Sequence, residues 1–349
     1  MLTARELRQA GMDVLIVERQ QSGRESSWAG GGILSPLYPW RYAEPVTALA
    51  AWSQGIYAQL CAQLQAESDI DPQWTRSGLL ILGAEDQVAA LAWAHSHNIT
   101  MEAAGASEAR AVEPHLGEGL PGGVWLPQVA QVRNPRLVRA LRASIERSGV
   151  RIMENTAVSR IRVEAGQAVG VTTPAGDISA GRVVVASGAW SGEMLEQLGL
   201  RLAVEPVRGQ MILIRAQPGV VSRIVLSEQR YVIPRRDGRV LIGSTMERVG
   251  FDKATTDEAR EALMDAAARL IPALREYPLE YHWSGLRPGS PQGIPYIGEH
   301  SDISGLYVNA GHFRNGVVLG PASARLLGDL MLGREPVVPS AAYAPGRGE

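Results

Sequence analysis

The chain has 349 residues, of which 45% are hydrophobic and 20% are charged, enough to bury the core of two packed domains. Its 34 Lys and Arg residues nearly balance 36 Asp and Glu residues, giving a formal net charge of -2, which argues against a general affinity for nucleic acid or anionic membranes. Cys61 is the one cysteine, no Cys and His cluster has metal-ligand spacing, and neither a bilayer-spanning apolar run nor a signal peptide stands out, so we expect a cytoplasmic protein without disulfide, structural metal or membrane span.

The first residues predict a helix that leads into a strand. Residues 2–10 place Leu2 and Leu7 among charged and polar residues and stop at Gly11, a common helix end. The apolar run 14–17 then ends in Glu18 and Arg19, the pattern of a parallel strand that is buried on both faces. Helix and strand make half of a βαβ unit, whose first strand and Gly-rich turn would come before Met1.

Three consecutive glycines, Gly30 to Gly32, follow this half-unit. Such a run permits positive φ and a close approach of the backbone to a ligand. The next segments predict short elements and a second helix-to-strand step. The predicted helices are 45–66, 86–97 and 135–148, and the predicted strands are 78–83, 122–126 and 150–153.

The second half of the chain predicts a different kind of sheet. Two β segments flank a turn within residues 157–171, and a strand at 182–186 runs into Gly188, where an open α/β sheet presents backbone to a nucleotide. Residues 203–250 predict a mainly antiparallel sheet. They are followed by a helix at 256–270, strands at 280–286 and 303–308, a loop at 309–316, a helix at 317–332, and a poorly ordered tail from Glu335 onward.

Six segments in this order carry a resemblance to a known family: 14–19, 27–36, 183–190, 285–288, 295–298 and 311–321. Over nearly its whole length the sequence resembles the glycine oxidase branch of the D-amino-acid oxidase family of flavoenzymes, especially the bacterial enzymes of thiamine biosynthesis. The resemblance implies noncovalent FAD, a small amino acid and oxygen as partners, a homotetramer, and an α/β and α+β fold. An FAD-binding Rossmann-like domain (1–77, 135–202 and 288–349) would be interleaved with a substrate-binding domain (78–134 and 203–287) on a mainly antiparallel sheet.

The residues expected to bind FAD fall in several loops. Glu18 is placed to hydrogen-bond the adenosine ribose, although a solvated charge at a strand end would look the same. The resemblance assigns Ser26, Ser27 and the segment 30–33, called the glycine loop below, to the pyrophosphate and isoalloxazine. It assigns Val158 to the adenine, where an ordinary strand valine would look identical. If residues 315–318 begin the last helix beneath the flavin pyrimidine, the positive helix end stabilises negative charge there. The full set is Glu18, Arg19, Ser26, Ser27, Gly31, Gly32, Ile33, Val158, Gly188, His312, Phe313, Arg314, Asn315, Gly316, Val317 and Val318.

A planar guanidinium suits a substrate carboxylate because it binds two oxygens at once. Arg287 matches the carboxylate-binding arginine of the family and Tyr231 matches the tyrosine beside it, although a surface arginine and a core tyrosine are the simpler interpretations. Arg314 and Met246 match two further positions of the substrate pocket in this family. Met246 could instead be a methionine that only packs against its neighbours. His312 could be taken for a catalytic base, yet a lone His in a tight loop is more often a structural donor. We expect no catalytic acid or base, since orientation and electrostatics suffice for hydride transfer.

Three functions remain open at this point. The favoured one is an oxidase that converts glycine, sarcosine or small D-amino acids to the imine and then to the 2-oxo acid, ammonia and hydrogen peroxide, for thiamine thiazole synthesis. A second is a D-amino-acid dehydrogenase that passes electrons to a quinone or another acceptor. The third is an inactive chain that cannot retain FAD without its first strand. We expect Met1 to be a misassigned or trimmed start, preceded in the functional protein by roughly 15 residues with a G-x-G-x-x-G turn.

Overall fold

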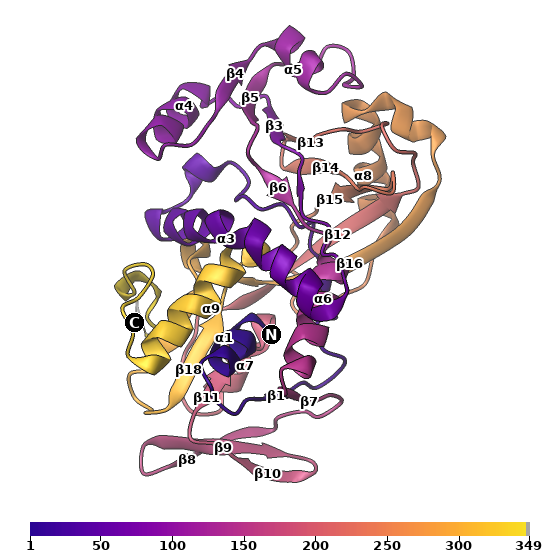
Figure 1. Ribbon diagram of the computed structural model, residues 1–349. Helices are drawn as coiled ribbons and strands as arrows, with labels where there is room; N and C mark the ends of the chain where they lie inside the picture. Colours follow the sequence, from indigo (N-terminus) through magenta and orange to yellow (C-terminus); the bar gives the residue numbers. More distant parts are fainter. Residues whose placement is uncertain (347–349) are drawn as a thin grey trace.

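The computed structural model describes residues 1–346 of the chain. Figure 1 shows an upper region built on one large sheet and a lower region in which smaller sheets lie among helices. The large sheet has eight strands in the order β16-β12-β15-β14-β13-β3-β5-β4. The predicted combination of a helix-and-strand region with a mainly antiparallel sheet is therefore confirmed.

The lower region starts with the predicted half-unit. Helix α1 (Leu2–Gln9) leads into β1 (Leu15–Val17), which pairs in parallel with β7 (Arg151–Met153), the strand that follows α6 (Asn134–Arg147). The residues of β1 are half-buried, whereas the sequence predicted burial on both faces. The physical reason is that, within residues 1–346, β1 has a strand partner on one edge.

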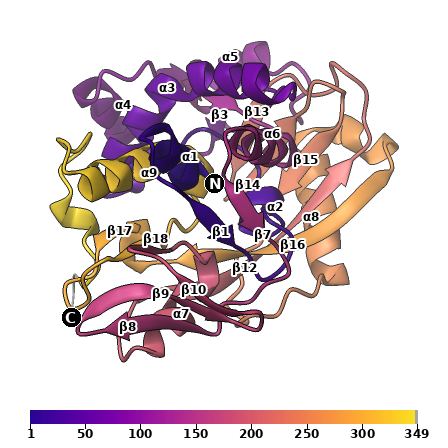
Figure 2. The ribbon, with the colours of Figure 1, turned by 60° about the horizontal axis from the view of Figure 1, so that its bottom comes forward.

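The lower region contains a second parallel pair of strands. Strand β11 (Val183–Val185) pairs in parallel with β18 (Leu306–Ala310), which pairs antiparallel with β17 (Tyr296–Glu299). Strand β18 begins three residues later than the predicted strand 303–308. Helix α9 (Gly316–Leu332) packs against both α1 and α3 (Glu44–Ser68), and both views of the ribbon show α1 and α9 side by side (Figures 1 and 2).

Residues 160–179 form a small antiparallel sheet at the bottom of the molecule (Figure 2). The turn between its first two strands is at Gly166, where φ is +76°, within the range 157–171 in which the sequence predicts a turn between two β segments. Its strands are β8 (Arg160–Glu164), β9 (Gln167–Thr173) and β10 (Gly176–Ser179).

The eight-stranded sheet organises the upper region. All its neighbouring strands pair antiparallel except β13 and β3, which run in parallel. Its strands are β3 (Leu79–Leu82), β4 (Glu102–Ala104), β5 (Gly123–Leu126), β12 (Glu205–Ile214), β13 (Ile224–Ser227), β14 (Arg230–Pro234), β15 (Val240–Gly243) and β16 (Leu279–Gly289).

Helix α8 (Asp257–Leu270) covers one face of this sheet. The Thr256 side chain caps the helix by accepting a hydrogen bond from the Ala259 amide at 3.3 Å. Ile212, Ile242 and Leu263 belong to one buried cluster between helix and sheet. Because strand side chains alternate, the residues next to Ile212 and Ile242 point to the opposite face, away from α8.

The C-terminal segment corrects one expectation from the sequence. The tail after Glu335 was predicted to be poorly ordered, yet Val338 is 8% exposed and Tyr343 is 1% exposed. The Tyr343 hydroxyl donates to the Pro45 carbonyl at 2.7 Å, so the segment is packed onto the start of α3. Residues 347–349, the last three of the predicted FAD-binding range, lie outside the described residues.

Among residues 1–346 no helix combines the length and the apolar character needed to cross a bilayer. Shorter elements connect the helices and sheets described above. They include α2 (Ser26–Ala29), α4 (Gln87–Ser96), α5 (Ala106–Val112), α7 (Ser191–Glu196), β2 (Thr75–Arg76), β6 (Ala130–Gln131), η1 (Pro39–Arg41), η2 (Gly188–Trp190), η3 (Pro272–Glu276), η4 (Pro291–Gly293) and η5 (Ala341–Tyr343).

Candidate functional site

The face of the large sheet opposite α8 carries the two side chains predicted to hold a substrate. Tyr231 pairs with Gly243 across β14 and β15, and Gly243 pairs with Met211 of β12. Four residues further along β12, Val207 pairs with Arg287 of β16. The alternation of side chains therefore places Tyr231 and Arg287 on the same face.

Glycines on this face leave space for both side chains. A methyl group at Gly209 would overlap the Arg287 guanidinium, and one at Gly243 would lie 2.6 Å from the Tyr231 hydroxyl. A methyl group at Gly285 would lie 2.7 Å from Cβ of Ala29 in α2. These three glycines therefore leave room on the face of the sheet for the guanidinium, the tyrosine ring and helix α2.

Arg287 is held by neutral groups and keeps part of its guanidinium free. Its Nη2 donates to the Ser244 hydroxyl at 2.7 Å and its Nη1 donates to the Thr245 carbonyl at 3.1 Å. Within residues 1–346 its Nε has no acceptor and no carboxylate pairs with it. Burial lowers the pKa of Arg287, but an arginine remains protonated at neutral pH. A half-buried cation with free donors is a site for an anion.

The ion pair of Arg41 shows which edge of a guanidinium binds a carboxylate in this protein. Arg41 binds Asp86 through its Nε and Nη2 atoms, each at 2.7 Å from a carboxylate oxygen. In Arg287 the Nε proton has no acceptor among residues 1–346, and Nη2 donates to the Ser244 hydroxyl and so keeps a second proton. Tyr231, which is 6% exposed, lies near enough to raise the pKa of Arg287, while Arg314 lies near enough to lower it.

The glycine loop lies against this face of the sheet. A methyl group at Gly31 would stand 3.3 Å from the Tyr231 hydroxyl, so the loop predicted to bind FAD meets the tyrosine predicted to bind substrate. Gly32 has φ +79°, and a methyl group there would overlap the Val132 carbonyl. Glycine is required at position 32 for both reasons.

The loop is fixed from behind while two of its amides stay free. The Asn134 amide donates to the Ser27 carbonyl at 2.9 Å, and Gly32 O accepts from Val132 N at 2.9 Å. Among the described residues, neither Gly31 N nor Gly32 N has a protein acceptor. Free amides of this kind bind anionic groups.

The loop before α9 approaches the site from the other side. Phe313 N donates to the Pro288 carbonyl at 2.8 Å, which places this loop next to Arg287. His312 Nε2 and Asn315 Nδ2 are buried and have no partner in the described part of the chain. Burial lowers the pKa of His312 to about 4, so its imidazole is neutral at neutral pH and cannot act as a cation.

Helix α9 begins at Gly316, where its first amides face this loop. Val317 is half-buried and its carbonyl accepts from the Tyr57 hydroxyl at 2.7 Å, while Val318 is buried. The positive end of a helix favours negative charge. That residues 315–318 stabilise charge on the flavin stays a prediction.

A third group lies at the carboxyl end of β1. Glu18 N donates to the Met153 carbonyl of β7 at 2.8 Å, and Thr156 N donates to Glu18 O at 2.9 Å. These bonds bring Glu18 beside the segment that contains Val158. Arg19 lies 3.8 Å from the ring centroid of Trp190, next to Gly188. These residues meet where a parallel sheet usually binds a nucleotide.

Arg19 also belongs to a closed ring of contacts between the two regions. Trp190 stacks on Phe251 at 5.3 Å, and Glu25 pairs with Arg19 at 3.5 Å and with Lys253 at 3.1 Å. The ring joins the end of β1 to the loop after β15.

The remaining predicted residues line the edges of the site. Arg314 Nη1 donates to the Gln229 side chain at 3.4 Å. Met246 is 51% exposed, so it is open to solvent and does not pack in a core. Ser26 is half-buried and Ser27 is exposed in α2, and Ile33 bridges to Gln131 of β6.

Sequence reasoning missed several neighbours of these residues. Ser244, Gln229 and Asn134 hold Arg287, Arg314 and the glycine loop, respectively. None stands in a motif, because each acts through a contact between distant segments. Arg235 is a fourth such residue: its Nη2 donates to Gly31 O at 2.8 Å.

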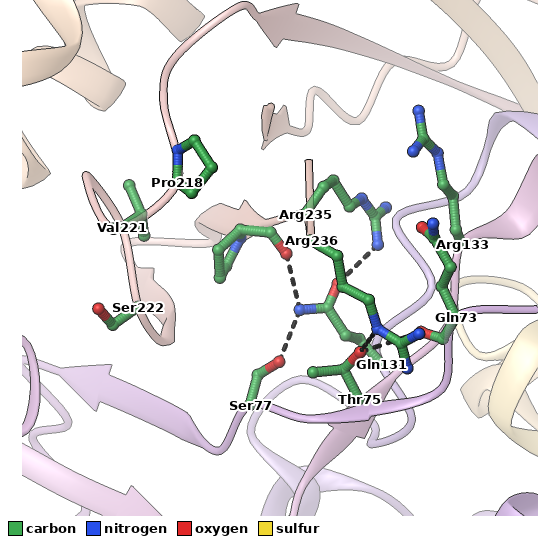
Figure 3. A pocket seen from close by; sticks show the side chains of 12 residues that line it. Gln73, Thr75, Ser77, Gln131, Arg133, Pro218, Val221, Ser222, Arg235 and Arg236 are labelled. Carbon is green, nitrogen blue, oxygen red and sulfur yellow. Dashed lines mark hydrogen bonds between the residues drawn. The ribbon is translucent and has the colours of Figure 1, made fainter. Parts of the chain in front are cut away.

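A pocket of about 310 Å³ lies behind the glycine loop, between β2, β6 and the end of β14. In Figure 3 the Gln131 side chain stands at its centre and bonds to Arg235, Ser77 and the Pro234 carbonyl. The pocket contains none of the residues that were predicted to bind FAD or substrate.

Comparisons with known proteins identify the family to which the chain is similar. The sequence profile of a family described as "DAO: FAD dependent oxidoreductase" matches residues 1–330. A glycine oxidase of Pseudomonas aeruginosa is 52% identical over 346 residues, covering 99% of this chain and 95% of that protein. A bifunctional ThiO/ThiG protein of Synechocystis is 32% identical over 98% of this chain and 51% of its own length. The crystal structure of glycine oxidase from Geobacillus kaustophilus matches with a TM-score of 0.94 and 30% identity, covering 100% of this chain and 95% of that one.

Proposed function

Because the chain belongs to the family of FAD-dependent oxidoreductases, we propose that it oxidises glycine and other small amino acids at the face of the large sheet. The observation that carries this proposal is the Arg287 guanidinium, which has free donors and no carboxylate partner within residues 1–346. The similarity to glycine oxidases supports glycine as the substrate.

The residues around the glycine loop fit FAD. Gly31 and Gly32 offer free amides, and their lack of side chains leaves the backbone open to a ligand. Near them, the buried polar atoms His312 Nε2 and Asn315 Nδ2 have no partner among residues 1–346. Such atoms are costly unless a ligand or water satisfies them.

The cofactor would be held along its length by three groups already described. Glu18, Arg19, Val158 and Gly188 would take the adenosine end, the glycine loop with Ser26 and Ser27 the middle, and residues 312–318 the flavin. Bound FAD supplies the hydride acceptor.

Arg287 and Tyr231 would fix the substrate by its carboxylate. The free edge of Arg287 donates two hydrogen bonds to the two oxygens, and the Tyr231 hydroxyl adds a third donor. The fixed carboxylate orients the α-carbon, so that the C–H bond to be broken is held in one position. The neighbouring cation Arg314 adds to the positive field that attracts the carboxylate.

The reaction removes two electrons and two protons from the amine. The α-carbon loses a hydride and the nitrogen loses a proton, which gives the imine; water then adds to release ammonia and the 2-oxo acid. Oxygen takes up two electrons and two protons to give hydrogen peroxide. Because desolvation lowers the pKa of His312 to about 4, solvent rather than His312 would accept the amine proton.

Substrate size would be limited by the groups around Arg287. Met246 directly follows Thr245, whose carbonyl accepts a hydrogen bond from Arg287, and Arg314 lies near enough to Arg287 to lower its pKa. This arrangement supports glycine, sarcosine and small D-amino acids, and argues against bulky side chains. Supply of the imine to thiamine thiazole synthesis is part of the proposal and is supported by the similarity to the ThiO/ThiG protein.

The test uses the purified full chain loaded with FAD. We expect glycine to bleach the flavin absorbance without oxygen, and to produce peroxide and ammonia in equal amounts under air. Bleaching without peroxide would contradict the oxidase and favour a dehydrogenase with another acceptor. A loaded protein that no small amino acid bleaches would contradict the whole proposal.

The predicted domain ranges, homotetramer and cytoplasmic setting stay predictions. Size-exclusion chromatography with light scattering would test the tetramer.

A further inference from the structure

Arg235 is a buried cation that has no carboxylate partner. It is 9% exposed and stands directly after β14, and within residues 1–346 it forms no ion pair. Its hydrogen bonds go to neutral oxygens: Gln131 Oε1 at 2.6 Å, Val132 O at 3.1 Å and Gly31 O at 2.8 Å. An unpaired buried charge is costly, and Arg235 lies outside the substrate site.

The position of Arg235 explains what it contacts. Tyr231 and Ile233 share one face of β14 because side chains alternate along a strand, and Arg235, directly after the strand, follows the same alternation. A methyl group at Gly31 would lie 3.0 Å from Ile233 and 3.3 Å from the Tyr231 hydroxyl. The glycine loop therefore lies against this face, and the Arg235 guanidinium donates to its Gly31 carbonyl.

The bond to Gly31 O acts on a single peptide group. The peptide between Gly31 and Gly32 is trans, so its carbonyl and its N–H point in opposite directions. Arg235 holds the carbonyl, and Gly32 N has no protein acceptor among the described residues. A charged donor on the carbonyl polarises the peptide and makes the N–H a stronger donor.

We propose that Arg235 is a positioning residue that fixes and polarises the Gly31–Gly32 peptide so that its free N–H binds the FAD. This inference rests on the proposed function only in that FAD is the ligand; it does not depend on which substrate is oxidised. The positive charge also stabilises electrons added to the bound FAD. Burial lowers the pKa of Arg235 to about 10, which leaves it charged at neutral pH.

The test replaces Arg235 with Met, which has similar length and no charge, and with Lys, which keeps the charge but not the fork. The matched control is Arg236→Met. Arg236 is the next residue and lines the same pocket (Figure 3), but its side chain is 46% exposed and pairs with Asp71 at 2.7 Å.

Dissociation constants for FAD are measured on folded apoprotein by fluorescence quenching, and midpoint potentials on the loaded protein by dye equilibration. We expect R235M to weaken FAD binding by about tenfold or more, the scale of one lost charge-assisted bond, and to make the potential more negative. We expect R235K to weaken binding less and to keep the potential, and R236M to match the wild type in both.

A purely structural Arg235 would give a different result. R235M would then lower the melting temperature of the apoprotein, while the folded fraction kept the wild-type dissociation constant and potential, and this outcome would overturn the inference. If R235M does not fold, an R235K protein with wild-type FAD affinity would overturn it as well. A wild-type chain that binds FAD but does not oxidise glycine would count against the proposed function alone.

Discussion

Replacing Arg287 with alanine removes the guanidinium that we assign to the substrate carboxylate. Two charge-assisted hydrogen bonds would be lost, and truncating one partner of a buried charge pair costs about 2 to 5 kcal/mol. At 1.36 kcal/mol per factor of ten, a middle value of about 3 kcal/mol predicts a loss of roughly 100-fold in kcat/KM. Because the carboxylate is bound equally before and during hydride transfer, most of the loss should appear in KM.

The assay compares glycine with glycinamide, which lacks the carboxylate. The wild type should prefer glycine strongly, whereas R287A should lose most of this preference while retaining FAD. Arg215→Ala is the matched control, since the Arg215 side chain is 64% exposed and pairs with Glu280 at 3.4 Å at the other end of β12. An R287A enzyme whose KM for glycine stays within about threefold of the wild type would refute the assignment.

Gly209→Ala offers an independent check of the same idea. A methyl group there would overlap the guanidinium, so Arg287 would be displaced without being removed. The KM for glycine should rise while the FAD spectrum stays unchanged. An unaltered KM would mean that the position of Arg287 is not critical.

Further predictions concern the tyrosine, the glycine loop, the histidine and the contact ring. Tyr231→Phe should raise the KM for glycine by roughly 2- to 10-fold, the effect of one hydrogen bond, and an unchanged KM in steady-state kinetics would argue for a core tyrosine. Gly32→Ala should abolish FAD retention, measured by absorbance, because φ is +79°. Burial lowers the pKa of His312 from 6.5 to about 4, so between these two pH values His312 is protonated in the unfolded chain and neutral in the folded chain. The free energy of unfolding should therefore be highest above about pH 6.5 and should fall as the pH drops toward 4, by up to about 3 kcal/mol. Urea titrations across this range should show a weaker pH dependence in His312→Asn. Trp190→Ala should lower the free energy of unfolding by about 1 to 2 kcal/mol, since it removes a cation–π contact and an aromatic pair, and Tyr281→Ala, at a residue 61% exposed, should not.

Elements with a clear period could be predicted from the sequence. Helix α6 and strands β3 and β5 lie within a residue or two of the predicted ranges, because their apolar spacing and flanking turns are local signals. The pairing of β13 with β3 could not be predicted, since Leu79 and Ile224 are far apart in the chain. The packed tail was missed because Pro- and Gly-rich composition does not reveal that Tyr343 reaches Pro45.

The candidate site divides in the same way. The resemblance named Arg287 and Tyr231, and the structure brings both onto one face beside Gly31. Arg235 gave no such signal, since an arginine after a strand usually lies at the surface. Its role depends on a contact with Gly31 that is formed only when the loop and the sheet meet.

The position of Arg287 depends on a core that touches neither substrate nor cofactor. Strands β12 and β16 pair continuously from Glu205 to Leu213, and their one irregularity lies between Leu213 and Ile214, at the end away from Arg287. A slip of one residue would turn Arg287 toward α8. It would also expose Ile212, which is 0% exposed in the cluster beneath α8. Burial of Ile212 and its neighbours therefore fixes the register that keeps the guanidinium on the same face as Tyr231. Substitutions under α8 that loosen this register should reduce carboxylate selectivity as well as stability.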